Sequence, residues 1–203
     1  GAMLAAVART AYQTGLTGLE FASGIPGTIG GAVVMNAGAY GGEMKNVLKE
    51  VTVLTKEGEV LVIPAKALEL GYRTSVIPKN GWIVLGAVLQ LKKGDQEQIL
   101  ARMEELKEQR ITKQPLDLPS AGSTFKRPEG YFAGKLIMDA GLRGFTVGGA
   151  QVSEKHCGFV VNRGNATAAD VWELICEVKR RVKEMTGVEL EPEVKLLGDF
   201  PQR

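Results

Sequence analysis

The sequence is densest in glycine between Ser23 and Gly42, where seven of the chain's 26 glycines fall. Glycine has no Cβ, so it accepts positive φ angles and lets backbone amides approach a ligand closely. A segment of this composition predicts loops with at most one short helix. Two interpretations remain open. The stretch is either a tight turn that needs glycine for backbone reasons, or a cradle for a flat or anionic ligand, in which Asn36 adds an amide able to match a heterocycle.

Three familiar motifs are absent from the chain. No window supplies the Gly-x-Gly-x-x-Gly of a dinucleotide-binding strand and helix. The segment from Gly130 to Leu136 has three residues between its glycines, whereas a phosphate-binding P-loop has four, and Leu136 stands where that loop needs a hydroxyl. The Gly-x-Ser-x-Gly of a hydrolase nucleophile is missing too. These three site types are therefore excluded.

Hydrophobic periodicity predicts the regular elements of the first half of the chain. Apolar residues at helical spacing predict a helix over residues 4–15. Alternating valines on both sides of a turn predict a hairpin over 51–63. Residues 82–91 are apolar on both faces, which predicts a central strand of a sheet. A capping box opens a helix over 95–113.

The second half follows a different order of elements. The pattern predicts a helix over 132–140 and short strands over 146–152 and 158–162. A cap at Thr167 and a glycine at position 187 bound the last helix, and a final strand is expected over 188–197.

Two prolines, at 115 and 119, mark the expected domain boundary. The sequence therefore predicts an α+β protein with two unequal lobes, residues 1–114 and residues 115–203.

Composition excludes several classes of protein. With 25 basic and 23 acidic side chains the net charge is +2, too small to indicate a nucleic-acid surface. No apolar run is long enough to predict a membrane span. Two cysteines and one histidine do not make a disulfide framework or a histidine-rich metal site, and this cysteine usage fits a reducing cytoplasm.

Two further stretches carry polar side chains that could take part in catalysis or binding. Ser123 lies among small residues, so its hydroxyl is accessible, and two cations follow it at 126 and 127. The alternative is a polar loop between domains. An acidic row ends at Glu193, although such a row on a strand is usually solvated. A catalytic triad of His156 and Ser123 with an acid is arithmetically possible, but a lone histidine is more often structural.

Together these stretches resemble the UDP-N-acetylenolpyruvoylglucosamine reductases (MurB) of bacterial peptidoglycan synthesis, in their type II form. The resemblance runs from Leu4 to Gly198. The strings that carry it, in the family's order, are Gly18–Ala32 with Asn36–Gly41, Gly71–Ser75, Ala121–Lys126 and Glu191–Val194.

The resemblance implies a fold, a reaction and two cofactors. Residues 1–114 would be the C-terminal part of a FAD-binding domain of the PCMH/VAO type. Residues 115–203 would be a smaller α+β substrate-binding domain whose final strand returns to the FAD-binding part. The family uses FAD and NADPH to reduce the enolpyruvyl ether of UDP-N-acetylglucosamine to UDP-N-acetylmuramate, in the cytoplasm, as an oxidoreductase of cell wall synthesis that also bears on cell shape, the cell cycle and division.

The resemblance also implies roles for individual residues. Ser123 matches the family's proton donor, and Arg73 and Glu193 match its other two active-site residues. Residues in or near the second lobe that are expected to hold the sugar and diphosphate are Lys113, Tyr131, Lys135 and Gln151. Residues expected to contact FAD are Ser23, Gly24, Ile25, Pro26, Gly27, Thr28, Gly30, Gly31 and Asn36.

The family also carries an N-terminal segment, ahead of the first helix, whose glycine-rich loop holds the FAD pyrophosphate. This sequence lacks it, so the fragment alone is expected to be inactive. The alternative function is a nucleotide-sugar-binding module without redox activity, and a third hypothesis is another flavoenzyme of the same broad fold, such as a relative of the alcohol oxidases. The expected partner is a small UDP-sugar, with neither nucleic acid nor membrane involved.

Overall fold

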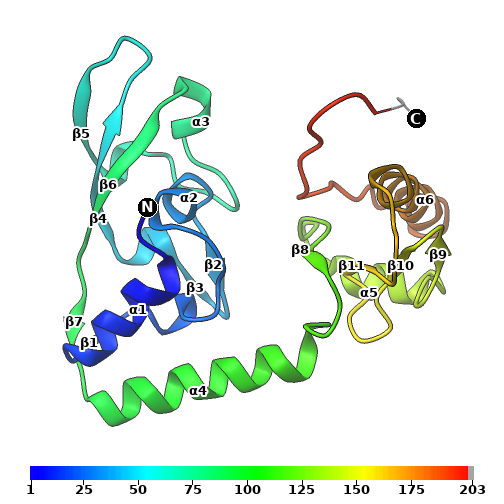
Figure 1. Ribbon diagram of the computed structural model, residues 1–203, viewed down its shortest axis with the longest axis horizontal. Helices are drawn as coiled ribbons and strands as arrows, with labels where there is room; N and C mark the ends of the chain where they lie inside the picture. Colours follow the sequence, from blue (N-terminus) through cyan, green and yellow to red (C-terminus); the bar gives the residue numbers. More distant parts are fainter. Residues whose placement is uncertain (201–203) are drawn as a thin grey trace. The chain divides into compact units, whose positions relative to one another are not determined.

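The computed structural model describes residues 1–200, and these form two compact units (Figure 1). The first unit is Gly1–Arg110 and the second begins at Ile111, so the division falls just before the residue 114 boundary that the prolines predict. Each unit has its own hydrophobic core.

The first unit is built on a three-stranded antiparallel sheet in the order β5-β4-β6. The predicted hairpin is confirmed: β4 (Leu48–Leu54) pairs with β5 (Val60–Pro64), and Val51 and Val53 on β4 are fully buried. The predicted first helix is α1 (Leu4–Gln13), which buries Leu4, Ala8 and Ala11. The other elements of this unit are β1 (Leu16–Thr17), η1 (Glu20–Ala22), α2 (Ile29–Val34), β2 (Gly38–Ala39), β3 (Gly42–Glu43), η2 (Met44–Asn46), η3 (Ala65–Ala67), α3 (Ile77–Asn80), β6 (Ile83–Leu89) and β7 (Lys92–Lys93).

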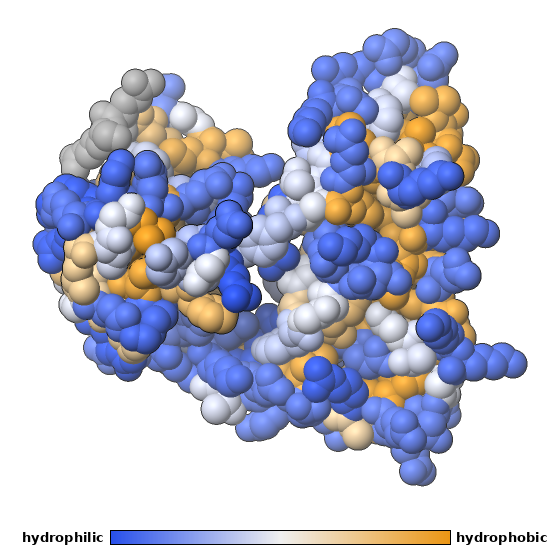
Figure 2. Space-filling model, turned by 180° about the vertical axis from the view of Figure 1, so that it is seen from behind, coloured by the Kyte–Doolittle hydropathy of each residue, from blue (hydrophilic) through white to orange (hydrophobic). Residues whose placement is uncertain are grey.

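The expectation of a central strand over 82–91 is wrong. Its regular part is β6, which pairs with β4 alone and forms an edge of the described sheet. Ile83 and Leu85 are 62% and 55% exposed, so one of the two apolar faces is open in the described residues. Figure 2 shows hydrophobic residues gathered along the side of this unit that holds the sheet. An apolar composition on both faces does not reveal how many neighbouring strands pair with a strand, and this explains the error.

Helix α4 (Gln96–Lys113) crosses from the first unit into the second. Asp95 Oδ1 accepts a hydrogen bond from the backbone N–H of Gln98, which is the predicted cap at its start. Its inward-facing residues Ile99 and Leu106 are buried, as the helical spacing predicts.

The second unit is a four-stranded antiparallel sheet in the order β8-β11-β10-β9. Its elements are β8 (Ser120–Ser123), α5 (Ala133–Asp139), β9 (Thr146–Val147), β10 (Ala150–Val152), β11 (Phe159–Asn162) and α6 (Ala168–Thr186). Helix α6 packs against β9 and β10 (Figure 1). Its buried stripe of Leu174, Ile175, Val178 and Val182 forms the centre of this core, as its periodicity predicts.

The ends of α6 confirm the predicted start and stop signals. The Thr167 side chain accepts a hydrogen bond from the Asp170 N–H at 3.1 Å, and the Asp170 carboxylate accepts one from the Thr167 N–H at 2.8 Å. Hydrogen bonding to the backbone N–H of Thr167, and then to its side chain, holds the pKa of Asp170 below its usual value. At the other end Gly187 has φ 73°, the left-handed conformation that suits glycine.

Replacing Thr167 by alanine is expected to cost about 1 kcal/mol of unfolding free energy, because an orphan N–H at the start of α6 loses its acceptor. Urea denaturation followed by circular dichroism measures the change. Thr167→Ser keeps a hydroxyl and should lose at most a few tenths of a kcal/mol. Equal losses in the two variants would mean that the methyl group, and not the cap, stabilises the unit.

The expected strand over 188–197 does not form as a regular strand. One isolated bridge joins Pro192 to Phe125, and two hydrogen bonds flank it: the Lys126 N–H donates to Glu191 O and the Glu193 N–H donates to Thr124 O. Leu190 is fully buried in the second core. Pro192 lacks an N–H, which limits the length of any ladder here. The segment thus pairs with residues 124–126 of its own unit.

Candidate functional site

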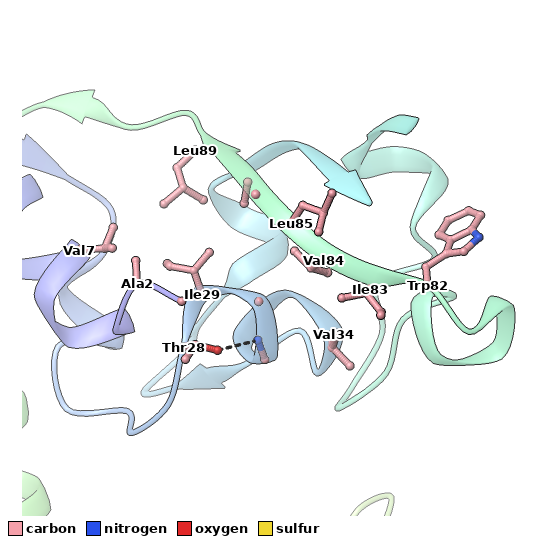
Figure 3. Close-up of a pocket in the computed structure, with 15 residues that line it drawn as sticks. Ala2, Val7, Thr28, Ile29, Val34, Trp82, Ile83, Val84, Leu85 and Leu89 are labelled. Carbon is pink, nitrogen blue, oxygen red and sulfur yellow. Dashed lines mark hydrogen bonds between the residues drawn. The ribbon is translucent and has the colours of Figure 1, made fainter. Parts of the chain in front are cut away.

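An open pocket of about 650 Å³ lies in the first unit, along β6 and beside α2 (Figure 3). Its lining combines small residues that leave backbone accessible with large apolar side chains. The lining residues are Gly1, Ala2, Val7, Thr28, Ile29, Gly30, Gly31, Val34, Trp82, Ile83, Val84, Leu85, Gly86, Ala87 and Leu89. None of these described residues has a charged side chain, so the pocket suits a flat apolar group better than an anion.

Part of the glycine-rich stretch forms this pocket. Thr28, Gly30 and Gly31 belong to the lining, and Thr28 Oγ1 accepts a hydrogen bond from the Gly31 N–H at 3.2 Å (Figure 3). This bond caps α2, the one short helix that the stretch was expected to allow. The other residues expected at a flavin, Ser23, Gly24, Ile25, Pro26, Gly27 and Asn36, do not line the pocket.

The glycines of this stretch have different surroundings. Gly27 has φ 116°, and a Cβ there would meet open space, so its backbone conformation demands glycine while its surface stays accessible. A Cβ on Gly24 would stand 2.8 Å from Nε of Arg110, so a larger residue there would displace this flexible side chain. Gly27 supports the interpretation of a turn that needs glycine for backbone reasons, and the interpretation as a ligand cradle stays a prediction.

Asn36 is fully buried and its amide is engaged within the protein. Its Nδ2 donates to Glu43 Oε2 at 2.5 Å and to Gly71 O at 2.9 Å, and its Oδ1 accepts from the Lys45 N–H at 2.9 Å. These bonds tie the glycine-rich stretch to the loop that carries Arg73. The expected contact between Asn36 and a cofactor stays a prediction.

Arg73 stands in that loop with φ 54°, a left-handed conformation that costs free energy in a non-glycine residue. Its Nη2 donates to Gly38 O at 3.0 Å, and its guanidinium lies 5.0 Å from the centroid of the Tyr72 ring. The loop therefore holds the guanidinium against the glycine-rich stretch of the same unit. Strained residues of this kind concentrate at functional sites.

The chain segments that carry Ser123 and Glu193 are paired in the second unit. Ser123 ends β8 with an exposed side chain. The carbonyl oxygen of the next residue, Thr124, accepts a hydrogen bond from the Glu193 N–H at 2.8 Å. Glu193 therefore lies on the chain segment that pairs with the end of β8. Thr124 is itself buried, and its Oγ1 accepts the Val160 N–H at 3.0 Å, which anchors the strand end.

His156 lies near Gly158, as Ser123 does, although sequence reasoning set it aside as a structural residue. The position that a Cβ on Gly158 would occupy is 3.0 Å from Cε1 of His156 and 3.7 Å from Oγ of Ser123. The two side chains therefore flank the same glycine. The sequence signal was weak, because 32 residues separate Ser123 from His156. Strand pairing brings their segments together, since Phe159 is the partner of Ser123 in the ladder of β8 and β11.

The four residues expected to bind the sugar and diphosphate differ in accessibility. Tyr131 is half-exposed just before α5. Lys135 on α5 is exposed and forms an ion pair with Asp139. Lys113 is the exposed last residue of α4. Gln151 on β10 is buried, and its Nε2 donates to Gly144 O at 3.1 Å, so this side chain supports the core of the unit.

The described part of the chain has neither a metal-binding cluster nor a membrane-spanning helix. Residues 1–200 hold no group of three His, Cys, Asp or Glu side chains placed to bind a metal ion. No helix within them is long and apolar enough to cross a membrane.

Comparison with protein families gives two matches, one in each half of the chain. Residues 114–197 match the C-terminal domain of UDP-N-acetylenolpyruvoylglucosamine reductase, and residues 1–63 match a FAD binding domain family. The first match contains Ser123 and Glu193, and the second contains the glycine-rich stretch.

Individual relatives agree with these matches. UDP-N-acetylenolpyruvoylglucosamine reductase of Agathobacter rectalis is 62% identical over 98% of this chain, and that of Caldanaerobacter subterraneus is 55% identical over 98%. The chain spans 64% and 66% of the length of these two relatives. The crystal structure of UDP-N-acetylenolpyruvylglucosamine reductase (MurB) from Thermus caldophilus superposes with a TM-score of 0.82 at 43% identity, covering 94% of this chain and 69% of that one. At this level of identity and coverage, the chain belongs to the UDP-N-acetylenolpyruvoylglucosamine reductase family.

Proposed function

We propose that the protein containing this chain reduces UDP-N-acetylglucosamine enolpyruvate to UDP-N-acetylmuramate for peptidoglycan synthesis in the cytoplasm, with NADPH as electron source and FAD as cofactor. The observation that carries the proposal is the exposed Ser123 hydroxyl at the end of β8, with Glu193 on the adjoining segment. The family to which the chain belongs is named for this reductase activity. The alternative, a nucleotide-sugar-binding module, gives no chemical role to Ser123 and Glu193.

The residues of the pocket fit the flat ring system of FAD but not its pyrophosphate. Gly30, Gly31, Gly86 and Ala87 leave room beside β6 for a flat ring system, and Thr28 adds a polar edge. A pyrophosphate needs cations or several directed N–H groups, and the pocket has no charged side chain among its described lining residues. Bound flavin, when reduced, supplies the hydride that the reaction requires.

The side chains of the chain itself account for the rest of the chemistry. The guanidinium of Arg73 is suited to bind a carboxylate through two parallel hydrogen bonds. Such binding stabilises negative charge that builds up next to that carboxylate. Ser123 is suited to deliver a proton to the carbon that carries this charge, because its hydroxyl is accessible. Glu193, partly buried on the segment that pairs with Thr124, is suited to orient the donor or, when protonated, to stabilise the enolic form.

Binding of the sugar and diphosphate is assigned to the second unit. Tyr131 and Lys135, both accessible around the start of α5, are the strongest candidates for direct contact, and Lys113 is accessible on α4. Gln151 is buried and bonded to Gly144, so its contribution would come through the strand it stabilises.

The direct test is a reaction with the full-length protein. Purified protein is mixed with NADPH and UDP-N-acetylglucosamine enolpyruvate, and mass spectrometry follows the gain of two hydrogens by the substrate. Product that forms only when all three are present supports the proposal. Protein that carries FAD and oxidises NADPH but leaves the enolpyruvyl group intact would refute it.

The 203-residue chain alone is expected to retain little or no FAD, because its pocket accommodates the ring without a grip on the pyrophosphate. The measurement is flavin absorbance after gel filtration, compared with the full-length protein prepared in the same way. A colourless chain and a yellow full-length protein are the expected results. Stoichiometric FAD on the chain would show that residues described here suffice to hold the whole cofactor.

A further inference from the structure

Arg73 lies in a strained four-residue turn that starts at Gly71 and ends at Thr74. The Gly71 N–H donates to Thr74 O at 3.1 Å, and the Thr74 N–H donates to Gly71 O at 3.4 Å. Arg73 is the third residue of this turn and has φ 54°, a conformation that favours glycine or asparagine there. Strain of this kind persists only where the surrounding structure enforces it. Here hydrogen bonds to the glycine-rich stretch enforce it.

Two buried side chains fix the turn to the glycine-rich stretch, one on each side of Arg73. Asn36 is fully buried, and its Nδ2 donates to Gly71 O at 2.9 Å. Ser75 is 3% exposed, and its Oγ donates to Val34 O at 2.7 Å. A hydrogen bond shielded from water is stronger than one exposed to it, so these two bonds restrict the backbone of Arg73 from both sides.

The amide of Asn36 is held in one orientation. The Lys45 N–H donates to its Oδ1 at 2.9 Å, so the Nδ2 end must face the carbonyl oxygen of Gly71. Nδ2 also donates to Glu43 Oε2 at 2.5 Å, so both of its hydrogens have protein acceptors. Glu43 is fixed in turn by an ion pair with Lys45 at 2.8 Å and by the Asn46 N–H at the start of η2.

We propose that Asn36 is a positioning residue for the reaction, because its hydrogen bond to Gly71 O holds the turn that presents the guanidinium of Arg73. This inference rests on the proposed function, in which Arg73 binds the carboxylate of the enolpyruvyl group. A guanidinium binds a carboxylate through two parallel hydrogen bonds only in one relative orientation, so a turn that moves would misalign both. Arg73 Nη2 donates to Gly38 O at 3.0 Å, which fixes the guanidinium against the same stretch.

An exchange of two side chains in the full-length protein separates positioning from a purely structural role. Asn36→Asp keeps the size of the side chain and its tolerance of a positive φ, but it cannot donate to Gly71 O, and its carboxylate would face that of Glu43. Adding Glu43→Gln restores a hydrogen bond between positions 36 and 43, now donated by the glutamine. Gly71 O still lacks its side-chain donor in this double variant.

The double variant should regain most of the thermal stability that Asn36→Asp loses. Reoxidation of its flavin by the enolpyruvyl substrate should nevertheless stay about 10- to 10²-fold slow, because the turn that carries Arg73 is no longer held. Stopped-flow flavin absorbance and thermal unfolding measure the two properties. Recovery of the rate together with the stability would overturn the proposal.

Glu43→Gln alone is the matched control. Its amide oxygen can still accept from Asn36, so the bond to Gly71 O stays and the rate should remain close to that of the unchanged protein. A rate as low as that of the double variant would assign the effect to Glu43. All of these proteins should retain FAD, since both Nδ2 hydrogens of Asn36 are bonded within the protein. Loss of FAD from the double variant would assign Asn36 to the cofactor. Either result would overturn the positioning role.

A double-mutant cycle tests the dependence on Arg73. In an Arg73→Ala background, the exchange at positions 36 and 43 should cause little further loss of rate, because the group that Asn36 positions is gone. Independent, multiplicative losses would overturn the proposal and leave the proposed function standing.

Ligand affinity gives a readout that needs no turnover. UDP-N-acetylglucosamine enolpyruvate has the carboxylate that Arg73 is proposed to bind, and UDP-N-acetylglucosamine lacks it. Titrations followed by flavin absorbance should show affinity for the first ligand lowered about 10-fold in the double variant and in Arg73→Ala, with affinity for the second unchanged. A loss in Arg73→Ala alone would overturn the inference and leave the proposed function standing. No loss in Arg73→Ala would refute the role of Arg73 itself, and the inference with it.

Discussion

Ser123→Ala in the full-length protein is expected to slow reoxidation of the flavin by the enolpyruvyl substrate by about 10²- to 10⁴-fold, which is the usual contribution of a positioned general acid. Reduction of the flavin by NADPH should stay nearly unchanged, because that half-reaction needs no proton for the sugar substrate. Stopped-flow flavin absorbance measures the two half-reactions separately. Substrate binding should also stay the same, since one hydroxyl is a small part of the contacts that a UDP-sugar makes.

Two further variants make the test of Ser123 specific. Ser120→Ala removes an exposed hydroxyl from the other end of β8 and should change neither half-reaction. Ser123→Cys should recover part of the lost rate, because a thiol can still donate a proton. If Ser123→Ala slowed both half-reactions equally, or weakened substrate binding without slowing reoxidation, Ser123 would be a structural residue of the strand and the proton would come from another group.

Local signals predicted the helices well because the relevant interactions are local. In α6 the cap at Thr167, the apolar stripe and Gly187 all lie within one run of chain, and the cap and Gly187 are found as the pattern indicates. The apolar spacing also continues to Met185, but Met185 is exposed, so the stripe is buried only as far as Val182. The same holds for the hairpin of β4 and β5, where a short turn sets the register. The short helix in the glycine-rich stretch was foreseen only as an option, because glycine-rich sequence permits several backbone conformations.

Interactions across long stretches of sequence were beyond such reasoning. The sequence of β6 shows two apolar faces but not which neighbour it pairs with, so its edge position was missed. The polar side chain of Asn36 offered chemistry to a ligand, yet the fold commits it to Glu43, Gly71 and Lys45. Burial decides such cases, and burial is a property of the assembled core.

The candidate site shows the same limit. Ser123 and Glu193 were predicted as site residues through the family resemblance, and the segments that carry them are adjacent because strand-like hydrogen bonds join residues 124–126 to 191–193. His156 was set aside because a lone histidine carries no motif. Its position near the segment of Ser123 depends on the pairing of β8 with β11 and on two glycines distant in sequence, Gly134 and Gly158.

The arrangement of the second unit depends on the core beneath α6, and Leu174→Ala should therefore destabilise it by about 2–5 kcal/mol. Leu174 is fully buried at the centre of that core, and truncation leaves a cavity that packed strands fill poorly. The chain has two tryptophans, Trp82 in the first unit and Trp172 on α6, so Trp172 fluorescence in a Trp82→Phe background follows urea unfolding of the second unit.

Met185→Ala is the matched control for this prediction, because Met185 lies on the same helix and is 57% exposed. It should change the unfolding free energy by no more than about 0.5 kcal/mol. A large loss in Leu174→Ala with an unchanged Met185→Ala would show that burial, and not helix propensity, stabilises α6. Similar small losses in both variants would mean that the second unit does not depend on the burial of Leu174.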